Sequence, residues 1–214
     1  PSSGSNCRLL QVGAGLCAHG RSILPAIMAA SPPFLTGKLL LAMPGIGDPR
    51  FERSVIAICQ HDENGALGIG IGRIMPRLGL HGLLGQFGIE AGSVRDVPIH
   101  AGGPVEPQRG FVLHSLDWGG QDSMQVSNLW SLTATIDVLR VIGTDKGPKR
   151  WLVALGYAGW GPGQLDEEMH RHGWHVADAN ETLLYDMPVE ERWTAAFEAQ
   201  GIDPRLLAVD SGHA

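Results

Sequence analysis

Charge, cysteine and long apolar runs are all scarce in this sequence. Of its 214 residues, 18 % are charged and 43 % are hydrophobic. No apolar run reaches the roughly eighteen residues that a membrane-spanning helix needs. The three cysteines, Cys7, Cys17 and Cys59, give no even set of partners for a disulfide framework. We therefore expect no association with a membrane and a location in the reducing cytoplasm.

Basic residues are also few. The chain has 16 Lys and Arg against 22 Asp and Glu, which gives a formal net charge of −6. The arginines between residues 50 and 95 stand singly and form no basic stripe: Arg50, Arg53, Arg73, Arg77 and Arg95. An acidic chain of this kind repels a phosphate backbone. Direct binding of nucleic acid is therefore not expected, and we expect a small molecule or a protein as partner.

Glycine and proline, by contrast, are abundant, with 30 and 14 residues. Both disfavour helix interiors, so they indicate many turns between short strands and helices. We predict an α+β fold in a single domain over residues 34–214. Residues 1–33 mix Ser and Gly with short apolar pieces, and we interpret them as a leader that is disordered or includes sequence upstream of a true start at Met28. A weak signal peptide over Arg21–Ala30 is the alternative.

Hydrophobic patterning predicts strands and helices in alternation. The clearest pair is a hairpin of Ser54–Gln60 and Ala66–Ile71, joined across an Asn64-Gly65 turn. Further strands are expected at Lys38–Met43, Val97–Ala101, Gly110–Ser115 and Trp151–Tyr157, with a weaker one at Met124–Trp130. A stiff loop is expected over Gly102–Pro107. Helices are expected over residues 80–87, 136–142, 164–169 and 188–200.

A glycine-rich corner follows the strand at Trp151–Tyr157. We expect its glycines and its proline to interrupt regular structure before a helix begins at Gln164. These residues are Gly156, Gly159, Gly161, Pro162 and Gly163. The first amides of a helix can face an anion, although Asp166 and Glu167 near this helix start oppose a phosphate. Tyr157 and Trp160 either line a pocket here or pack the corner.

Two motifs resemble a nucleotide-binding loop and a metal site, but the sequence around each argues against that function. Gly68-Ile69-Gly70-Ile71-Gly72 looks like a nucleotide loop, but it lies in a hairpin strand and opens no helix. His170, His172 and His175 form the densest set of metal-capable side chains. Neighbours two apart on a helix point away from each other, which favours a solvated helix end. We expect no metal and no cofactor.

A general acid/base group is a further alternative. His61 follows one predicted strand, His114 ends another, and Asp48 or Glu63 could serve as the acid. Whether they meet depends on the fold, and histidines at strand ends are often hydrogen-bonded turn residues. Cys59 lies in an apolar run and is expected to be a buried small hydrophobe.

An ordered series of motifs resembles the bacterial AlgH/YqgE family over roughly Leu35–Tyr185. The series includes Gly37–Leu40, Asp48–Val55, Gly102–Val105, Gly110–His114 and Gly156–Leu165. The chain departs from the family pattern at Gly72-Arg73-Ile74 and at Gly173-Trp174. The resemblance implies an α+β fold with a large mixed sheet flanked by helices, in a cytosolic bacterial protein with no agreed activity. Some family members carry the label of a transcriptional regulator.

We expect a non-enzymatic binding or regulatory module, with a site where the two glycine-bearing loops meet. A hydrolase-like enzyme and a DNA-binding regulator are the alternatives. The predicted binding residues are Gly102, Gly103, Pro104, His114, Tyr157, Trp160 and Gln164.

Overall fold

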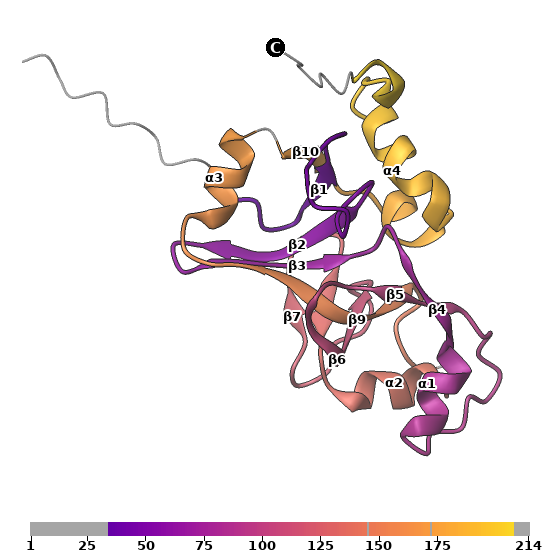
Figure 1. The fold of residues 1–214 in the computed structure, drawn as a ribbon. Helices are drawn as coiled ribbons and strands as arrows, with labels where there is room; N and C mark the ends of the chain where they lie inside the picture. The colour runs from indigo at the N-terminus through magenta and orange to yellow at the C-terminus, as the bar shows by residue number, and fades with distance from the viewer. Residues whose placement is uncertain (1–33, 145, 172, 208–214) are drawn as a thin grey trace, which may run out of the picture. The chain divides into compact units, whose positions relative to one another are not determined.

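A ten-stranded sheet organises the chain. The computed structural model describes residues 34–144, 146–171 and 173–207, which all belong to one unit of contacts, Pro32–Ala214. The strands follow the order β10-β1-β2-β3-β9-β6-β8-β7, and β5 joins β4 to β9 (Figure 1). Every pair is antiparallel except β5 with β9, so the predicted mixed sheet flanked by helices is confirmed.

The bounds of the elements are as follows. The strands are β1 (Lys38–Ala42), β2 (Val55–Asp62), β3 (Gly65–Gly70), β4 (Ile74–Gly79), β5 (Pro98–Ala101), β6 (Val105–His114), β7 (Met124–Gln125), β8 (Ser131–Thr133), β9 (Trp151–Trp160) and β10 (Trp174–Asp178). The helices are α1 (Leu80–Gln86), α2 (Ile136–Ile142), α3 (Gln164–His170), a π-helical turn η1 (Thr182–Asp186), α4 (Val189–Glu198) and a 3₁₀ turn η2 (Pro204–Leu206).

The predicted hairpin of β2 and β3 is confirmed. Asp62 pairs with Gly65 across a turn of two residues, Glu63 and Asn64, and Gly65 has a φ of +131°. A side chain rarely adopts that backbone conformation, which is why glycine stands there. The register shifts between Ile58 and Gln60, which marks an irregularity in β2.

The expected break in the glycine corner is wrong, because β9 continues to Trp160. Gly156 has a φ of +74°, and a Cβ there would lie 2.4 Å from the carbonyl oxygen of Gly103. Glycine in a strand can mark a close approach of another backbone instead of its end. The corner is therefore short and begins at Gly161.

Three other segments differ from expectation. β6 begins at Val105, so the second half of the stiff loop predicted over Gly102–Pro107 is strand, with a register shift between Val105 and Gly110. β4 was not predicted because Pro76 breaks its pattern. The segment His170–His175, expected as a helix end, is divided, since α3 ends at His170 and β10, which pairs with β1, begins at Trp174.

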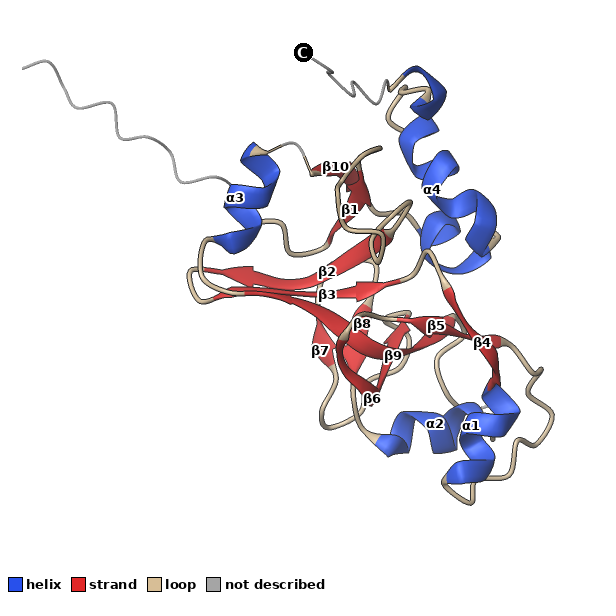
Figure 2. Cartoon of the chain, in the orientation of Figure 1, coloured by secondary structure: helices blue, strands red, loops and turns tan. Residues whose placement is uncertain are grey.

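Both faces of the sheet around β1 and β2 are buried. Leu39 and Leu41 pack in one cluster with α4, whereas Leu40 and Ala42 pack in another with Leu165 of α3. Alternation of side chains along a strand produces this division. At the other end of the fold, α1 and α2 lie beside each other and cover β5, β6 and β9 (Figure 2).

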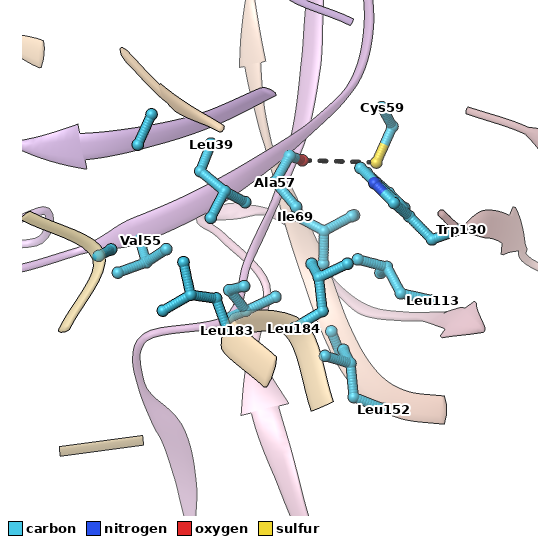
Figure 3. Packing of buried hydrophobic residues seen from close by; sticks show 14 of the residues in the cluster. Leu39, Val55, Ala57, Cys59, Ile69, Leu113, Trp130, Leu152, Leu183 and Leu184 are labelled. Atoms are coloured by element: carbon cyan, nitrogen blue, oxygen red, sulfur yellow. Dashed lines mark hydrogen bonds between the residues drawn. The ribbon is translucent and has the colours of Figure 1, made fainter. Parts of the chain in front are cut away.

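The largest cluster contains Cys59 and Trp130. Cys59 is 2 % exposed, and its thiol contacts the carbonyl oxygen of Ala57 at 3.5 Å (Figure 3). Burial raises the pKa of this thiol far above its usual range. Cys59 is thus the small buried hydrophobe that the sequence predicts. Within the described residues, no helix has the length and apolar character required to cross a bilayer.

Candidate functional site

A groove of about 510 Å³ lies where the end of β3, the start of β4 and the loop after β5 meet the loop that precedes β2. Its lining includes three of the predicted binding residues, Gly102, Gly103 and Pro104. Gly70 and Gly72 also line it, so we call it the glycine groove. The volume falls in the range of small-molecule sites.

The glycines are required because backbone segments approach closely here. The amide of Gly70 donates to the carbonyl oxygen of Gly102 at 2.7 Å. A Cβ on Gly70 would lie 2.6 Å from the carbonyl oxygen of Ala101, and one on Gly103 would lie 2.1 Å from the carbonyl carbon of Tyr157. Such contacts are far inside van der Waals distance. The groove therefore has a wall of closely packed main chain.

Arginines that are separate in the sequence converge at this groove. Arg50 and Arg73 both line it, and the Arg73 Nη1 donates to the backbone oxygen of Arg50 at 2.9 Å. Arg53 and Arg73 line a shallower cavity that shares Gly72 with the groove. The β2–β3 hairpin produces this cluster, because its open end places the residues before Val55 beside those after Gly70.

The electrostatics of the groove favour an anion. No Asp or Glu occurs among its described lining residues. Arg50 is held by Asp48, whose Oδ2 accepts from its Nη2 at 2.7 Å, and hydrogen bonds from Arg50 hold the pKa of Asp48 below its usual value. Among the hydrogen bonds of the described residues, the side chain of Arg73 makes only the one to the carbonyl oxygen of Arg50. Its charge is therefore available to a ligand.

The structure does not bring His114 to this groove. His114 pairs with Trp151 at the far end of β9, whereas Val105 pairs with Tyr157 next to the glycines. The His114 ring is fully buried and lies 2.9 Å from the hydroxyl of Thr133. Burial lowers the pKa of this imidazole. Its position is that of a hydrogen-bonded core residue.

Trp160 and Gln164 belong to a third location. Glu168 accepts from the Trp160 indole at 3.0 Å, from the Trp174 indole at 2.8 Å and from the Gln164 amide at 3.0 Å. The Tyr157 ring stacks edge-on against Phe111 with centroids 5.8 Å apart, away from this cluster. The seven predicted residues are thus distributed over separate parts of the sheet, and three of them line the groove.

The alternative acid/base group is not assembled in the described residues. His61 accepts at Nδ1 from the amide of Leu35 at 3.1 Å, and its Nε2 lies 3.9 Å from Asp166. Within the described residues, neither Asp48 nor Glu63 forms a hydrogen bond or ion pair with His61. Asp48 is occupied by Arg50 instead. His61 therefore attaches the start of the described chain to β2.

The predicted histidine cluster is divided as well. His170 contacts the backbone oxygen of Asp166 at 2.6 Å at the end of α3. His175 lies in β10 and stacks on Phe197 with ring centroids 5.3 Å apart. His172 lies outside the described residues. Within the described part of the chain, no group of three or more His, Cys, Asp or Glu side chains is placed to hold a metal ion.

The fold defines an α+β class that is represented among solved structures. The solution structure of the AlgH protein from Pseudomonas aeruginosa matches with a TM-score of 0.69 at 35 % identity, over 86 % of this chain and 98 % of that one. A crystal structure of a Corynebacterium diphtheriae protein matches with a TM-score of 0.65 over 84 % of this chain and 93 % of that one. At a sequence identity of 20 %, this match shows only that the two proteins share a fold.

The chain belongs to the AlgH-like family, whose model matches residues 39–205. A relative from Rhizorhabdus wittichii is 61 % identical over 184 residues, which cover 86 % of this chain and 99 % of the relative. One from Sphingopyxis alaskensis is 54 % identical over 187 residues, or 87 % and 100 %. Both are named only as UPF0301 proteins. The family match confirms the resemblance and extends past Tyr185 to include α4.

Proposed function

We propose that this protein is a non-enzymatic binding module, with a regulatory role, that takes a small acidic molecule into the glycine groove. The observation that carries the proposal is the available charge of Arg73, beside an Arg50 that is paired with Asp48, in a groove with no acidic lining residue. The chain as a whole has a net charge of −6, so this local excess of positive charge is unusual for it. Convergent cations of this kind bind carboxylates and phosphates.

The remaining lining supports a ligand with an apolar body. Phe51, Ile74 and Pro104 contribute apolar surface beside the two guanidinium groups. Ile74 is 46 % exposed, which is high for a large aliphatic side chain in a strand. A ligand that carries one acidic group and an apolar portion of moderate size would contact both kinds of surface.

A thermal-shift screen of the full chain against aliphatic and aromatic carboxylic acids and phosphorylated metabolites tests the proposal. A compound that binds the folded state alone raises its melting temperature. Calorimetric titration then compares the wild type with Arg73→Gln and Arg50→Gln. We expect each change to weaken binding roughly tenfold or more, as for a lost hydrogen bond to a charged group.

Arg109→Gln is the matched control. Arg109 is exposed and pairs with Glu106 at 3.2 Å, outside the groove. Its replacement should leave the affinity unchanged. If acidic compounds stabilise the wild type and both groove variants equally, the assignment of the groove is wrong.

The hydrolase and DNA-binding alternatives have less support. The rings of His61 and His114 already form hydrogen bonds with the protein's own backbone and side chains.

A protein partner at the groove is the other form of the binding hypothesis. Such a partner would co-purify with the chain, and the small acidic ligand would displace it. A cytoplasmic location stays a prediction.

A further inference from the structure

A second cavity, of about 710 Å³, lies between β5, the η1 turn and the start of α4. Among the described residues, four buried side-chain polar atoms have no hydrogen-bond partner. Three of these atoms belong to residues that line this cavity: His100 Nδ1, Tyr185 Oη and Arg192 Nε. Buried polar atoms are nearly always paired in folded proteins. Their concentration around one cavity points to a missing partner.

Arg192 is the strongest of the three indications. Its side chain is 3 % exposed, and its guanidinium donates to the backbone oxygens of Ile71 and, at 2.9 Å, Met187. No carboxylate is among its partners in the described part of the chain. Burial lowers the pKa of Arg192 to about 10, so it remains a cation at neutral pH. A buried cation that contacts carbonyl oxygens alone lacks a counter-charge.

The other two groups supply hydrogen bonds without charge. His100 is 7 % exposed, and burial, with a contribution from the charge of Arg192, lowers its pKa to about 4, so the imidazole is neutral. Burial, with the charge of Glu181, raises the pKa of the Tyr185 phenol above its usual range, so the hydroxyl keeps its proton. The charged groups that act on the Tyr185 phenol include Arg150 as well as Glu181, and a protonated phenol can donate to an oxyanion.

The charges around the cavity are positive on balance. Arg95, Lys149, Arg150 and Arg192 line it, against Asp186 and Glu190. Arg150 already pairs with Asp186 at 3.1 Å and with Glu181 at 3.0 Å. Asp186 is therefore neutralised from within the protein, and Arg192 is left without such a pair.

We propose that this cavity, which we call the anion cavity, is a second binding site and takes a small oxyanion, a carboxylate or phosphate group, between Arg192, Tyr185 and His100. This site and the glycine groove share Ile74 in their linings but none of their polar or charged residues. His100 lines the anion cavity, whereas the next residue, Ala101, lines the groove. Adjacent residues of a strand face opposite sides, so β5 separates the two sites.

The experiment measures binding of inorganic phosphate, and in a second arm acetate, to the full chain at constant ionic strength, with chloride as the reference ion. Isothermal titration and the melting temperature give the readouts. In the wild type, phosphate or acetate should raise the melting temperature where chloride does not. The arm with the larger shift identifies the preferred oxyanion.

Tyr185→Phe is the decisive variant. It removes a hydroxyl that has no partner in the folded protein, so the melting temperature without oxyanion should stay the same or rise. The dissociation constant of the oxyanion should rise by roughly 5- to 10-fold, as for one lost hydrogen bond. Arg192→Met should abolish binding, and if that variant does not fold, the Tyr185→Phe result stands alone as the test.

Two controls separate this site from others. Arg140→Gln changes an exposed residue paired with Asp137, so it should bind phosphate as the wild type does. Arg73→Gln removes a cation of the glycine groove, and the effect of Tyr185→Phe on oxyanion binding should be the same in that background. Equal melting temperatures in chloride, phosphate and acetate would overturn the proposal. So would an oxyanion affinity that Tyr185→Phe leaves unchanged. If Arg73→Gln alone weakens binding, the oxyanion occupies the groove and the anion cavity is wrong.

Discussion

At the scale of single residues, Glu168 holds the sharpest set of contacts. Its two carboxylate oxygens accept from the indoles of Trp160 and Trp174 and from the amide of Gln164, all at 2.8–3.0 Å. Each of these three donors loses a charged acceptor if Glu168 changes. The side chain thereby fixes α3 against β9 and β10.

We predict that Glu168→Gln lowers the free energy of unfolding by about 1–3 kcal/mol, because an amide nitrogen would face a donor. Urea denaturation followed by tryptophan fluorescence measures it. Glu167→Gln is the control, since Glu167 is exposed and lies 3.8 Å from Arg171. That change should cost less than about 0.5 kcal/mol. Equal effects of the two substitutions would contradict the structural role of Glu168.

His100 predicts a pH dependence of stability. Its folded pKa of about 4 lies below the ordinary value of 6.5, because of burial and then the charge of Arg192. The unfolded chain therefore binds the proton more readily, and stability falls as pH decreases from 6.5 toward 4. Between pH 7 and pH 5 we expect a loss on the order of 2 kcal/mol from this residue.

Urea denaturation at the two pH values, in chloride buffer, measures this loss. His100→Gln should reduce the difference between pH 7 and pH 5. A remainder is expected, because burial also lowers the pKa of His114 and His175. An undiminished difference in the variant would show that His100 is not the group responsible.

At the scale of elements, glycines decide how closely strands approach. A Cβ on Gly102 would lie 2.1 Å from the carbonyl oxygen of Gly156, so β5 and β9 would have to separate. We predict that Gly102→Ala costs more than about 2 kcal/mol, as a severe overpacking contact does. Gly85 in α1 has no atom within 4 Å of the same position. Gly85→Ala should instead stabilise the fold by up to about 1 kcal/mol.

Thermal denaturation of the two variants gives the comparison. The opposite signs are the essential result, since the substitution is chemically the same. A loss of similar size in both variants would show that backbone contact at Gly102 does not determine the outcome.

The same element scale explains what the sequence could predict. The hairpin of β2 and β3 was predictable because the Asn64-Gly65 turn and the flanking apolar residues are local signals. The course of β9 through Gly156 was not, because the reason for that glycine is a backbone more than fifty residues away in Gly103. Local patterning reports no such contact.

The candidate site, too, was predictable only where local sequence signals mark it. Gly102, Gly103 and Pro104 were predicted as binding residues from their loop, and they line the groove. Arg73 stands alone in the sequence, and its position beside Arg50 depends on the register of the β2–β3 hairpin and on the fold of the loop before β2. The unpaired atoms around Arg192 were equally hidden, because burial is a property of the folded chain.

At the scale of the whole molecule, net charge opposes nucleic acid. The chain has a formal net charge of −6. The two arginines of the groove, Arg50 and Arg73, do not offset this excess of negative charge. We predict no binding of labelled duplex DNA at low salt, measured by fluorescence anisotropy. Binding that weakens steeply as salt rises would contradict this and restore the DNA-binding alternative.

The central position of β9 in the sheet limits where sequences of the family can gain residues. It pairs with β3 through residues 158–160, and with β5 and β6 through residues 151–157. One inserted amino acid within β9 would reverse the orientation of the side chains beyond it, in a strand that both halves of the sheet share. Insertions should therefore be tolerated in the loops around this strand and eliminated by selection within it.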